Sequence, residues 1–232
     1  MNKRKYIVDE KNKTFTKYYF NLEDKSKIYL EFKKGKILSK IVNYPKPISF
    51  NDQSITYEYL DIKYSLYNLL IRNKLKIKHL KKIGKYLRKM HNQNIMHGDF
   101  TPVNIVFTEN DKIFFIDASF SEYNNENQVL LEVDDIYRDI SLMIMHLRVS
   151  KPLYKPWLFL ANNRKIKNAF IDGYFDNKND FNKKRALTQE NKAINNNIIY
   201  YKKTSNFFII KYIRILLLKY YKFLNSLKYE KC

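Results

Sequence analysis

The sequence predicts an α+β fold in which short strands come first and helices follow. Up to Leu60, the apolar residues form short runs rich in β-branched and aromatic side chains, which polar turns separate. From residue 76 onward, apolar residues recur at spacings of three and four, as on one face of a helix. The 232 residues suffice for one domain with a sizeable core, and the apolar content of 45% is that of a globular protein. We expect a small, reduced strand-rich lobe at 1–60, a helical lobe at 61–206 and a basic amphipathic helix at 207–232.

The first lobe begins with a predicted hairpin and helix. Residues 5–19 read as two strands around a polar turn at 10–13, and the second strand is β-branched and aromatic. Residues 22–38 follow as a helix with an imperfect apolar face, which Gly35 weakens. The apolar face consists of Ile28, Leu30, Phe32 and Leu38.

Two further strands are predicted at residues 48–50 and 54–60. Pro45 and Pro47 favour an extended chain before the first of them. A polar turn at 51–52 separates the two strands, so we expect them to pair as a hairpin.

Two helices are predicted next, at residues 64–72 and 76–92. Asn94 then lies where a left-handed cap is expected after the second helix, a conformation that Asn tolerates. The apolar face of that helix consists of Leu80, Ile83, Leu87 and Met90.

Three oxygen-bearing side chains follow this helix, namely Asp99, Asn104 and Asp117. Strands at 104–107 and 112–116 are predicted to form a hairpin, which puts Asn104 and Asp117 at the same end of two paired strands. Mg²⁺ prefers oxygen ligands, so these two side chains suit a metal site. Phosphoryl transfer also needs a carboxylate that accepts the proton of the attacking hydroxyl, and Asp99 suits that role.

These residues resemble the protein-kinase-like superfamily, in its aminoglycoside-phosphotransferase-like branch. That branch has His-Gly-Asp where most protein kinases have His-Arg-Asp, and this chain has His97-Gly98-Asp99, then Phe-Thr-Pro and Asn104. The resemblance covers roughly residues 5–175. It implies a two-lobed protein-kinase-like fold that binds ATP and Mg²⁺, with Asp99 as the catalytic base and with Asn104 and Asp117 on the metal.

The resemblance also implies a nucleotide site in the first lobe. Lys17, on the second strand, would pair with the phosphates, and Glu31 would be its ion-pair partner, with Glu23 as the second choice. Glu58 and Leu60 would lie in the hinge whose backbone groups bind adenine. Ordinary surface charges and an ordinary core strand would give a similar pattern at these positions.

Two further residues are expected to support the catalytic loop. His97 would be a scaffold residue and neither an acid nor a base. Asp139 opens an apolar helix, where the resemblance implies an aspartate that holds the loop by hydrogen bonds. An acid that simply favours the positive end of the helix dipole is the alternative for Asp139.

The chain departs from the family in three ways. It has four glycines in all, so it lacks a glycine-rich loop over the phosphates. Phe15 stands where the family usually has a small apolar residue above adenine. Asp117 is followed by Ala118-Ser119-Phe120 in place of Phe-Gly, and the short segment 118–134 leaves little room for an activation loop and peptide platform.

The C-terminal part is predicted to be mainly helical. Residues 153–175 read as a helix, and 176–206, rich in Asn, Asp and Lys, as a loop with a short helix at 188–202. Residues 207–227 form a basic, aromatic helix, either lying on an anionic membrane or packed on the helical lobe with its lysines in water.

The net charge of +21 suggests an anionic partner, although the lysines are spread along the chain as compositional drift would also spread them. The one cysteine, Cys232, excludes a disulfide within the chain and fits a reducing cytoplasm. No signal peptide and no spanning segment are apparent. We therefore expect a cytoplasmic protein, peripheral at the inner membrane surface if residues 207–227 bind it. Nucleic acid is not expected as a partner, because only charge and aromatic content favour it.

The predicted activity is an ATP- and Mg²⁺-dependent phosphotransfer of the γ-phosphate to a hydroxyl of a small-molecule, sugar or lipid-linked substrate. One alternative is an atypical serine/threonine protein kinase. The other is a pseudokinase scaffold that binds a membrane or a protein partner, which the missing glycines and Phe15 favour. Asp99, Asn104 and Asp117 argue against the scaffold, since a scaffold does not need all three.

Overall fold

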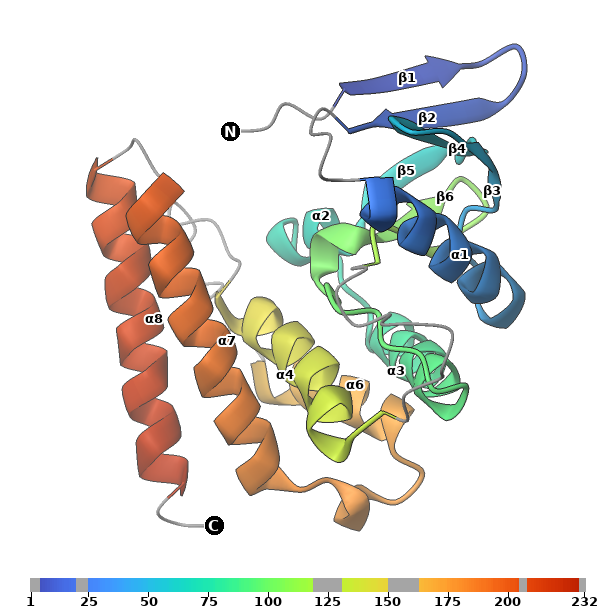
Figure 1. The fold of residues 1–232 in the computed structure, drawn as a ribbon. Coiled ribbons are helices and arrows are strands. Elements are labelled where there is room, and N and C mark those ends of the chain that lie inside the picture. Colours follow the sequence, from blue (N-terminus) through green and yellow to red (C-terminus); the bar gives the residue numbers. More distant parts are fainter. Residues whose placement is uncertain (1–4, 20–24, 119–130, 150–162, 205–207, 230–232) are drawn as a thin grey trace. The chain divides into compact units, whose positions relative to one another are not determined.

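The computed structural model describes residues 5–19, 25–118, 131–149, 163–204 and 208–229 (Figure 1). All the described strands lie before residue 116, and helices make up most of the chain after residue 131. The expected α+β class is therefore confirmed. The chain divides into two compact units, the first formed by Met1–Leu69 with Lys85–Leu131 and the second by Leu70–Gly84 with Glu132–Cys232. The predicted boundary between lobes after Leu60 stays a prediction.

The first unit contains a four-stranded antiparallel sheet in the order β1-β2-β4-β3. Its strands are β1 (Lys5–Asp9), β2 (Thr14–Tyr18), β3 (Pro47–Phe50) and β4 (Ser54–Glu58), close to the predicted hairpins. In the register of β2 with β4, Lys17 lies opposite Ile55 and Phe15 opposite Tyr57. This register sets which side chains of the central strands face helix α1.

Helix α1 (Lys25–Ile41) packs against strands β3 and β4 of this sheet (Figure 1). The prediction of a helix ending at residue 38 is wrong by one turn, because Val42 still donates to the Leu38 carbonyl. Gly35 is buried, and a Cβ there would lie 3.2 Å from Cγ of Pro47 and 3.3 Å from the Tyr44 ring. The glycine that weakens the helix in isolation therefore allows the following loop to pack closely on it.

A second sheet of the first unit has the order β5-β6-β7, with β5 (Ile62–Ser65), β6 (Ile105–Thr108) and β7 (Ile113–Phe115). The predicted hairpin is confirmed, since Ile105 pairs with Phe115. Strand β5 was not predicted, because its four residues are exposed or half-buried and show no alternation. The predicted helix at 64–72 is wrong at its start, since Ile62–Ser65 is strand and helix α2 runs over Leu66–Ile71.

Helix α3 (Ile77–Asn92) begins in the second unit and ends in the first. Its predicted apolar face is buried, since Leu80, Ile83, Leu87 and Met90 are all 0% exposed. Asn94 has a φ of 60°, so the expected left-handed residue after the helix is present.

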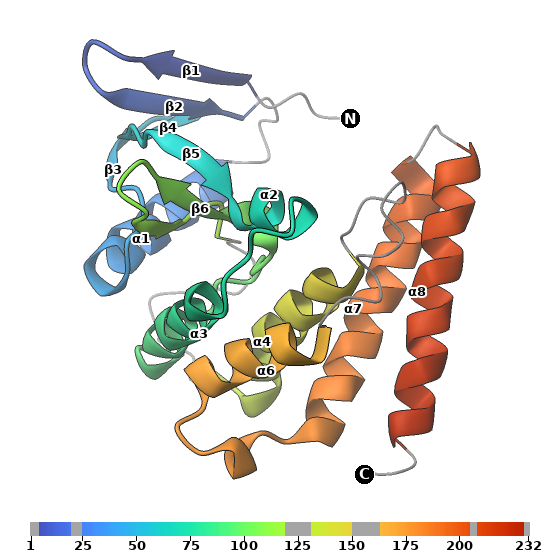
Figure 2. The ribbon, with the colours of Figure 1, turned by 180° about the vertical axis from the view of Figure 1, so that it is seen from behind.

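The second unit contains α4 (Val133–Val149), α6 (Asn163–Tyr174), a 3₁₀ turn at Lys178–Asp180, α7 (Lys183–Thr204) and α8 (Phe208–Tyr229). Helices α4, α7 and α8 pack side by side, as Figures 1 and 2 both show. The prediction of a loop with a short helix at 188–202 is wrong. Burial of Ala186, Leu187 and Ile194 overrides the low helix propensity of the asparagines. Of the helix predicted at 153–175, residues 153–162 lie outside the described part.

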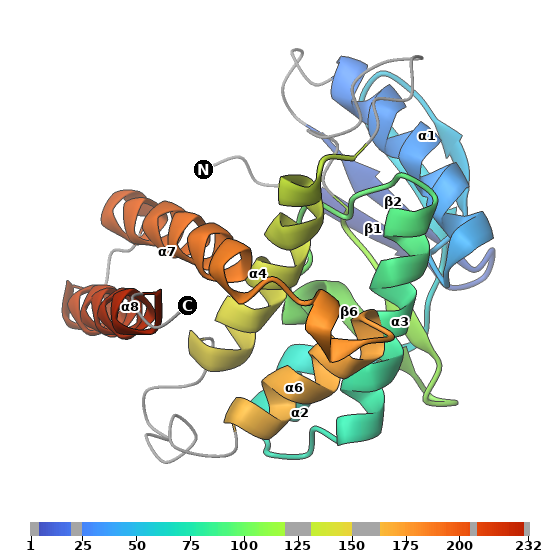
Figure 3. The same cartoon turned by 90° about the horizontal axis from the view of Figure 1, so that it is seen from below.

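Within this unit, α6 approaches the N-terminal half of α3 very closely (Figure 3). A Cβ on Gly84 would lie 2.7 Å from the backbone nitrogen of Tyr174, and one on Gly173 would lie 2.6 Å from Cα of Lys81. Both distances are shorter than a carbon contact allows, so the two helices can meet here only because both positions are glycine.

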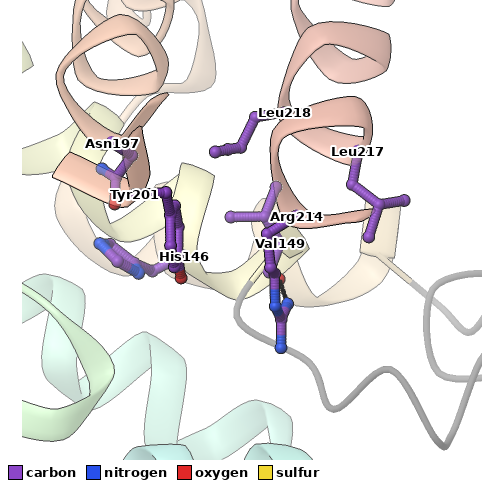
Figure 4. Close-up of a pocket in the computed structure, with 7 residues that line it drawn as sticks. All are labelled: His146, Val149, Asn197, Tyr201, Arg214, Leu217 and Leu218. Atoms are coloured by element: carbon purple, nitrogen blue, oxygen red, sulfur yellow. Dashed lines mark hydrogen bonds between the residues drawn. The ribbon is translucent and has the colours of Figure 1, made fainter. Parts of the chain in front are cut away.

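Helix α8 has one face buried in this unit, through Ile215, Leu218, Tyr221 and Asn225. A small cavity of about 20 Å³ lies beside that face and is lined by His146, Val149, Asn197, Tyr201, Arg214, Leu217 and Leu218 (Figure 4). The opposite face exposes Tyr212, Ile213, Leu216, Tyr220, Phe223 and Leu227.

The buried face agrees with the alternative in which the C-terminal helix packs on the helical part. The anionic membrane as a partner of residues 207–227 stays a prediction. No helix within the described ranges is both long and apolar enough to cross a membrane.

Candidate active site

Lys17 occupies the centre of a buried cluster of charges in the first unit. It lies on β2 with its side chain pointing toward α1, and the residue is only 3% exposed. Its Nζ lies 2.7 Å from Oε1 of Glu31, on α1, and 2.9 Å from Oδ1 of Asp117, just after β7. Two carboxylates that are far apart in sequence therefore share one buried ammonium group.

Glu31 accepts hydrogen bonds from two tyrosines in addition to Lys17. The Tyr57 hydroxyl donates to Oε1 over 3.0 Å, and the Tyr19 hydroxyl donates to Oε2. Glu31 is 3% exposed, so these bonds replace the water that a carboxylate would otherwise bind. The carboxylate is thus held by three donors at once.

The charges of this cluster keep Lys17 protonated. Burial by itself lowers the pKa of a lysine, but the carboxylates of Glu31 and Asp117 outweigh it and hold the pKa of Lys17 above its ordinary value. Burial, and after it the Glu31 charge, raises the pKa of Tyr57 well above its ordinary value, so this phenol remains a neutral donor. One cation and two anions leave the cluster with a net negative charge, which suits a cation as a further ligand.

Asp99 lies in a rigid loop that ends at Asn104. The Asn104 amide nitrogen donates to Oδ2 of Asp99 over 2.8 Å and to the Asp99 carbonyl over 3.0 Å. Thr101 donates its backbone N–H to the same carbonyl over 2.8 Å. Gly98 has a φ of 81°, a left-handed conformation that a residue with a Cβ resists. The loop therefore holds an exposed carboxylate in a fixed place.

Asn104 and Asp117 are brought together by the hairpin, as the sequence predicted. Asn104 ends a 3₁₀ turn before β6, and Ile116 donates its N–H to the Asn104 carbonyl over 3.0 Å. Asp117 follows directly with a φ of 52°, and its side chain is 39% exposed. The oxygens of both side chains are thus offered at one end of the sheet.

These residues fit Mg²⁺ and a nucleotide phosphate. The Asn104 amide nitrogen is engaged with Asp99, which leaves its oxygen as a ligand atom, and Asp117 adds a partly exposed carboxylate. No cluster of three or more His, Cys, Asp or Glu side chains suited to a metal occurs within the described residues. A pair of oxygen ligands completed by phosphate is the usual arrangement for Mg²⁺. Lys17 would lie next to such a phosphate.

The expected hinge residues lie on β4 and just after it. The Glu58 N–H donates to the Lys46 carbonyl, and the Tyr59 N–H donates to the Lys13 carbonyl, both over 2.9 Å. Leu60 follows this last pair and is half-buried. The roles of Glu58 and Leu60 toward adenine stay predictions.

His97 and Asp139 are both buried at 0% exposed. The His97 ring contacts Phe100 edge-on at 5.4 Å, and its carbonyl accepts a bond from Lys34 over 3.5 Å, as suits a scaffold residue. Asp139 lies on α4 in the second unit, so its expected hold on the catalytic loop stays a prediction. Glu23, the second choice as partner of Lys17, lies outside the described residues.

Sequence reasoning missed four residues around this site: Tyr19, Lys34, Tyr44 and Tyr57. A signal was present for two of them. Tyr19 and Tyr57 alternate with period two with Lys17 and Ile55, so strand geometry alone puts them on the inner face of the sheet. Lys34 lies one helical turn after Glu31 and is 2% exposed, which the abundance of lysine in this chain conceals. Nothing in the sequence distinguishes Tyr44 from the other tyrosines.

Comparison with known proteins was made at the level of families, sequences and structures. Residues 1–150 match the family model of the RIO domain, a range that contains Lys17, Glu31, Asp99, Asn104 and Asp117. Among solved structures, the chain is similar to an inhibitor-free description of the kinase fold in one respect only, its overall likeness to the MAP kinase LMAMPK10 from Leishmania major. That similarity has a TM-score of 0.39 and an identity of 14%, and it covers 74% of this chain and 59% of that one.

Three curated proteins are similar in sequence. The EKC/KEOPS complex subunit BUD32 of Enterocytozoon bieneusi is 28% identical over 187 residues, which cover 75% of this chain and 79% of that protein. A probable serine/threonine-protein kinase BUD32 homolog of Archaeoglobus fulgidus is 27% identical over 94 residues, 40% of each chain. A probable bifunctional tRNA threonylcarbamoyladenosine biosynthesis protein of Methanosphaera stadtmanae is 29% identical over 178 residues, and the chain spans 28% of its length.

Proposed function

Because the chain belongs to the RIO-domain family, we propose that it is an ATP- and Mg²⁺-dependent atypical kinase. The observation that carries the proposal is the buried Lys17 ammonium, held between Glu31 and the partly exposed Asp117. A buried lysine that two carboxylates keep charged can move toward a phosphate without a change of protonation. An ordinary structural ion pair would not leave one carboxylate open to solvent.

Each residue of the site has a role in this proposal. Lys17 pairs with the nucleotide phosphates, and Asn104 and Asp117 hold Mg²⁺. Asp99, fixed by the Asn104 amide, orients the acceptor hydroxyl and takes its proton. Bound ATP supplies the phosphoryl group, and Mg²⁺ neutralises charge on its phosphates.

The acceptor we favour is a serine or threonine hydroxyl of a protein. The Archaeoglobus relative carries the name of a probable serine/threonine-protein kinase, whereas none of the three relatives is named for a small-molecule acceptor. The small-molecule, sugar or lipid-linked acceptor expected from the short segment 118–134 therefore becomes the second choice. Incubation with labelled ATP distinguishes the two, since label on protein supports the first and label confined to small molecules contradicts it.

A second candidate function is that of a subunit in a complex for tRNA modification. It is favoured by relatives named as a KEOPS complex subunit and as a probable tRNA threonylcarbamoyladenosine biosynthesis protein. The chain would then have protein partners and would work close to nucleic acid, which its net charge of +21 suits. ATP turnover that rises when tRNA and partner proteins are added would support this function over that of an independent kinase.

The first test of the site is a thermal shift with ATP, with and without Mg²⁺. A ligand at 100 times its dissociation constant adds about 2.7 kcal/mol of stability, which is easily seen as a higher midpoint. We expect a Mg²⁺-dependent shift in the wild type that is lost in Asp117→Asn. Asp111→Asn is the matched control, because Asp111 is exposed, has a φ of 54° and lies away from the site. No shift in the wild type at millimolar Mg·ATP would contradict the proposal.

The second test is the turnover of Asp99→Ala. Loss of the proton acceptor should lower the rate by a factor on the order of 10²–10⁴, with the midpoint of unfolding little changed because Asp99 is exposed. Turnover close to that of the wild type would remove Asp99 from the mechanism.

A further inference from the structure

Three buried tyrosines surround the Lys17 site and are not explained by the roles above. They are Tyr19, directly after β2, Tyr44, after α1, and Tyr57, on β4, and we call them the tyrosine clamp. Their exposed fractions are 8%, 4% and 4%. Each comes from a different element, so the clamp joins the sheet, helix α1 and the end of the hairpin.

Two members of the clamp hold Glu31 from the side of the sheet. Tyr57 donates to Oε1 over 3.0 Å, Tyr19 donates to Oε2, and the Tyr19 backbone is itself tied to Gln53 over 2.7 Å. Because both carboxylate oxygens have phenol donors, Glu31 stays hydrogen-bonded even when the Lys17 ammonium turns toward another anion. The clamp thereby removes the penalty of leaving a buried carboxylate without a partner.

The third member acts at the other carboxylate. The Ala118 backbone N–H donates to the Tyr44 hydroxyl over 3.4 Å, directly after Asp117. Burial, then the charges of Glu31 and Asp117, raises the pKa of Tyr44 above its ordinary value, so its hydroxyl stays neutral. Tyr44 thus fixes the backbone that carries Asp117 in its left-handed conformation.

We propose that Tyr19, Tyr44 and Tyr57 are positioning residues that hold Glu31 and Asp117 in the arrangement that receives ligand, so that Lys17 can exchange a carboxylate for a phosphate. This inference rests on the proposed function. It also concerns regulation, because a helix α1 fastened by the sheet needs no contribution from the residues after Ala118 to stay in place. The site is therefore assembled before ligand arrives.

The main test is a double-mutant cycle on ATP affinity with Tyr19→Phe/Tyr57→Phe. These changes remove two hydroxyls and keep both rings, and Tyr200→Phe/Tyr220→Phe, at exposed tyrosines of α7 and α8, is the matched control. We expect ATP to bind roughly tenfold more weakly to the first variant and unchanged to the control. In the Lys17→Met background the same pair should change ATP affinity by less than twofold, because no ammonium remains to be positioned.

The cycle separates positioning from a purely structural role. Equal loss of ATP affinity in both backgrounds would overturn the proposal, as would wild-type affinity in the tyrosine variant. Tyr44→Phe adds a distinct readout, since it should reduce the gain in ATP affinity that Mg²⁺ brings, with little effect on binding without Mg²⁺. An unchanged Mg²⁺ dependence would remove Tyr44 from the clamp.

A readout without nucleotide keeps the clamp testable if the proposed function fails. Backbone hydrogen exchange in α1 should be roughly tenfold faster in Tyr19→Phe/Tyr57→Phe than in the control variant. Unchanged exchange would overturn the clamp, even in a protein that binds ATP. Faster exchange in a protein whose wild type binds no ATP would overturn the proposed function and leave the clamp as the element that holds α1.

Discussion

Each of the two units contains a buried basic residue paired with a glutamate, and the two clusters differ in where they end. In the first unit, Lys17 pairs with Glu31 and with Asp117, whose side chain is 39% exposed. In the second unit, Arg148 pairs with Glu190, and their side chains are 10% and 4% exposed. Arg148 also donates to Asn225 over 3.2 Å and lies 4.6 Å from the centre of the Tyr221 ring.

The comparison shows that burial of an ion pair does not by itself indicate an active site. The cluster around Arg148 lies among α4, α7 and α8, and the partners described for it are all buried groups, as in a structural network. The cluster around Lys17 has an excess of negative charge and one carboxylate open to solvent, as a site for a cation and a phosphate requires. The exposed carboxylate, rather than the buried lysine, separates the two.

The largest expected effect comes from removal of Arg148. In Arg148→Ala the buried carboxylate of Glu190 loses its counter-charge, which should destabilise the protein by about 3–5 kcal/mol. ATP affinity should be unchanged, and urea unfolding together with ATP titration measures both. The double variant Arg148→Met/Glu190→Gln is the control, since removal of both charges should restore much of the stability. Weaker ATP binding in Arg148→Ala, under conditions where it is folded, would break the distinction between the clusters.

The next effect is a pH dependence that belongs to the second unit. His146 lines the cavity of Figure 4, and burial lowers its pKa from 6.5 to about 4. The neutral form is therefore favoured by folding, and its stabilisation is complete above pH 6.5 and is lost as the pH falls toward 4. The loss should approach 3 kcal/mol, about 1.4 kcal/mol for each pH unit.

Unfolding of the wild type and of His146→Gln should be followed between pH 7 and pH 4.5. The variant should lack this part of the decrease, while ATP affinity should follow the same pH profile in both proteins. Equal slopes of stability against pH would show that His146 is solvated in the folded protein.

The smallest effect on stability is expected at Lys17. In Lys17→Met, Glu31 keeps its two phenol donors and Asp117 is hydrated, so the loss should be about 1–2 kcal/mol, below that of Arg148→Ala. ATP affinity should nevertheless fall at least tenfold, which a thermal shift with Mg·ATP measures. A variant that unfolds as readily as Arg148→Ala, yet binds ATP normally, would make Lys17 a structural residue and reverse the comparison.

Much of this site was predictable because its signals are local. The spacing of Asp99, Asn104 and Asp117 depends on one loop and one hairpin, and the structure brings Asn104 and Asp117 to one end of that hairpin. The expected protein-kinase-like superfamily is confirmed by the RIO-domain match, although the comparisons do not specify the aminoglycoside-phosphotransferase-like branch. Glu31 lies where a helix after β2 has to present a partner to Lys17.

The features that escaped prediction depend on tertiary contacts. Helix α7 forms from a sequence rich in asparagine because its apolar residues pack on α4, which no local propensity reveals. The tyrosine clamp escaped for a similar reason, since three of the chain's 20 tyrosines share a partner only after the sheet and α1 have packed. Strand β5 pairs through its backbone with β6, and its side chains show no pattern.

The close approach of α3 and α6 restricts how this protein can evolve. Gly84 and Gly173 each fill a place where a single methyl group has no room, so neither position tolerates even alanine while the other helix stays where it is. A lineage that replaces one of them has to move a whole helix, and with it the residues that α6 carries. Two of the four glycines in the chain therefore form a coupled pair, and we expect homologous chains to keep both or to change both together.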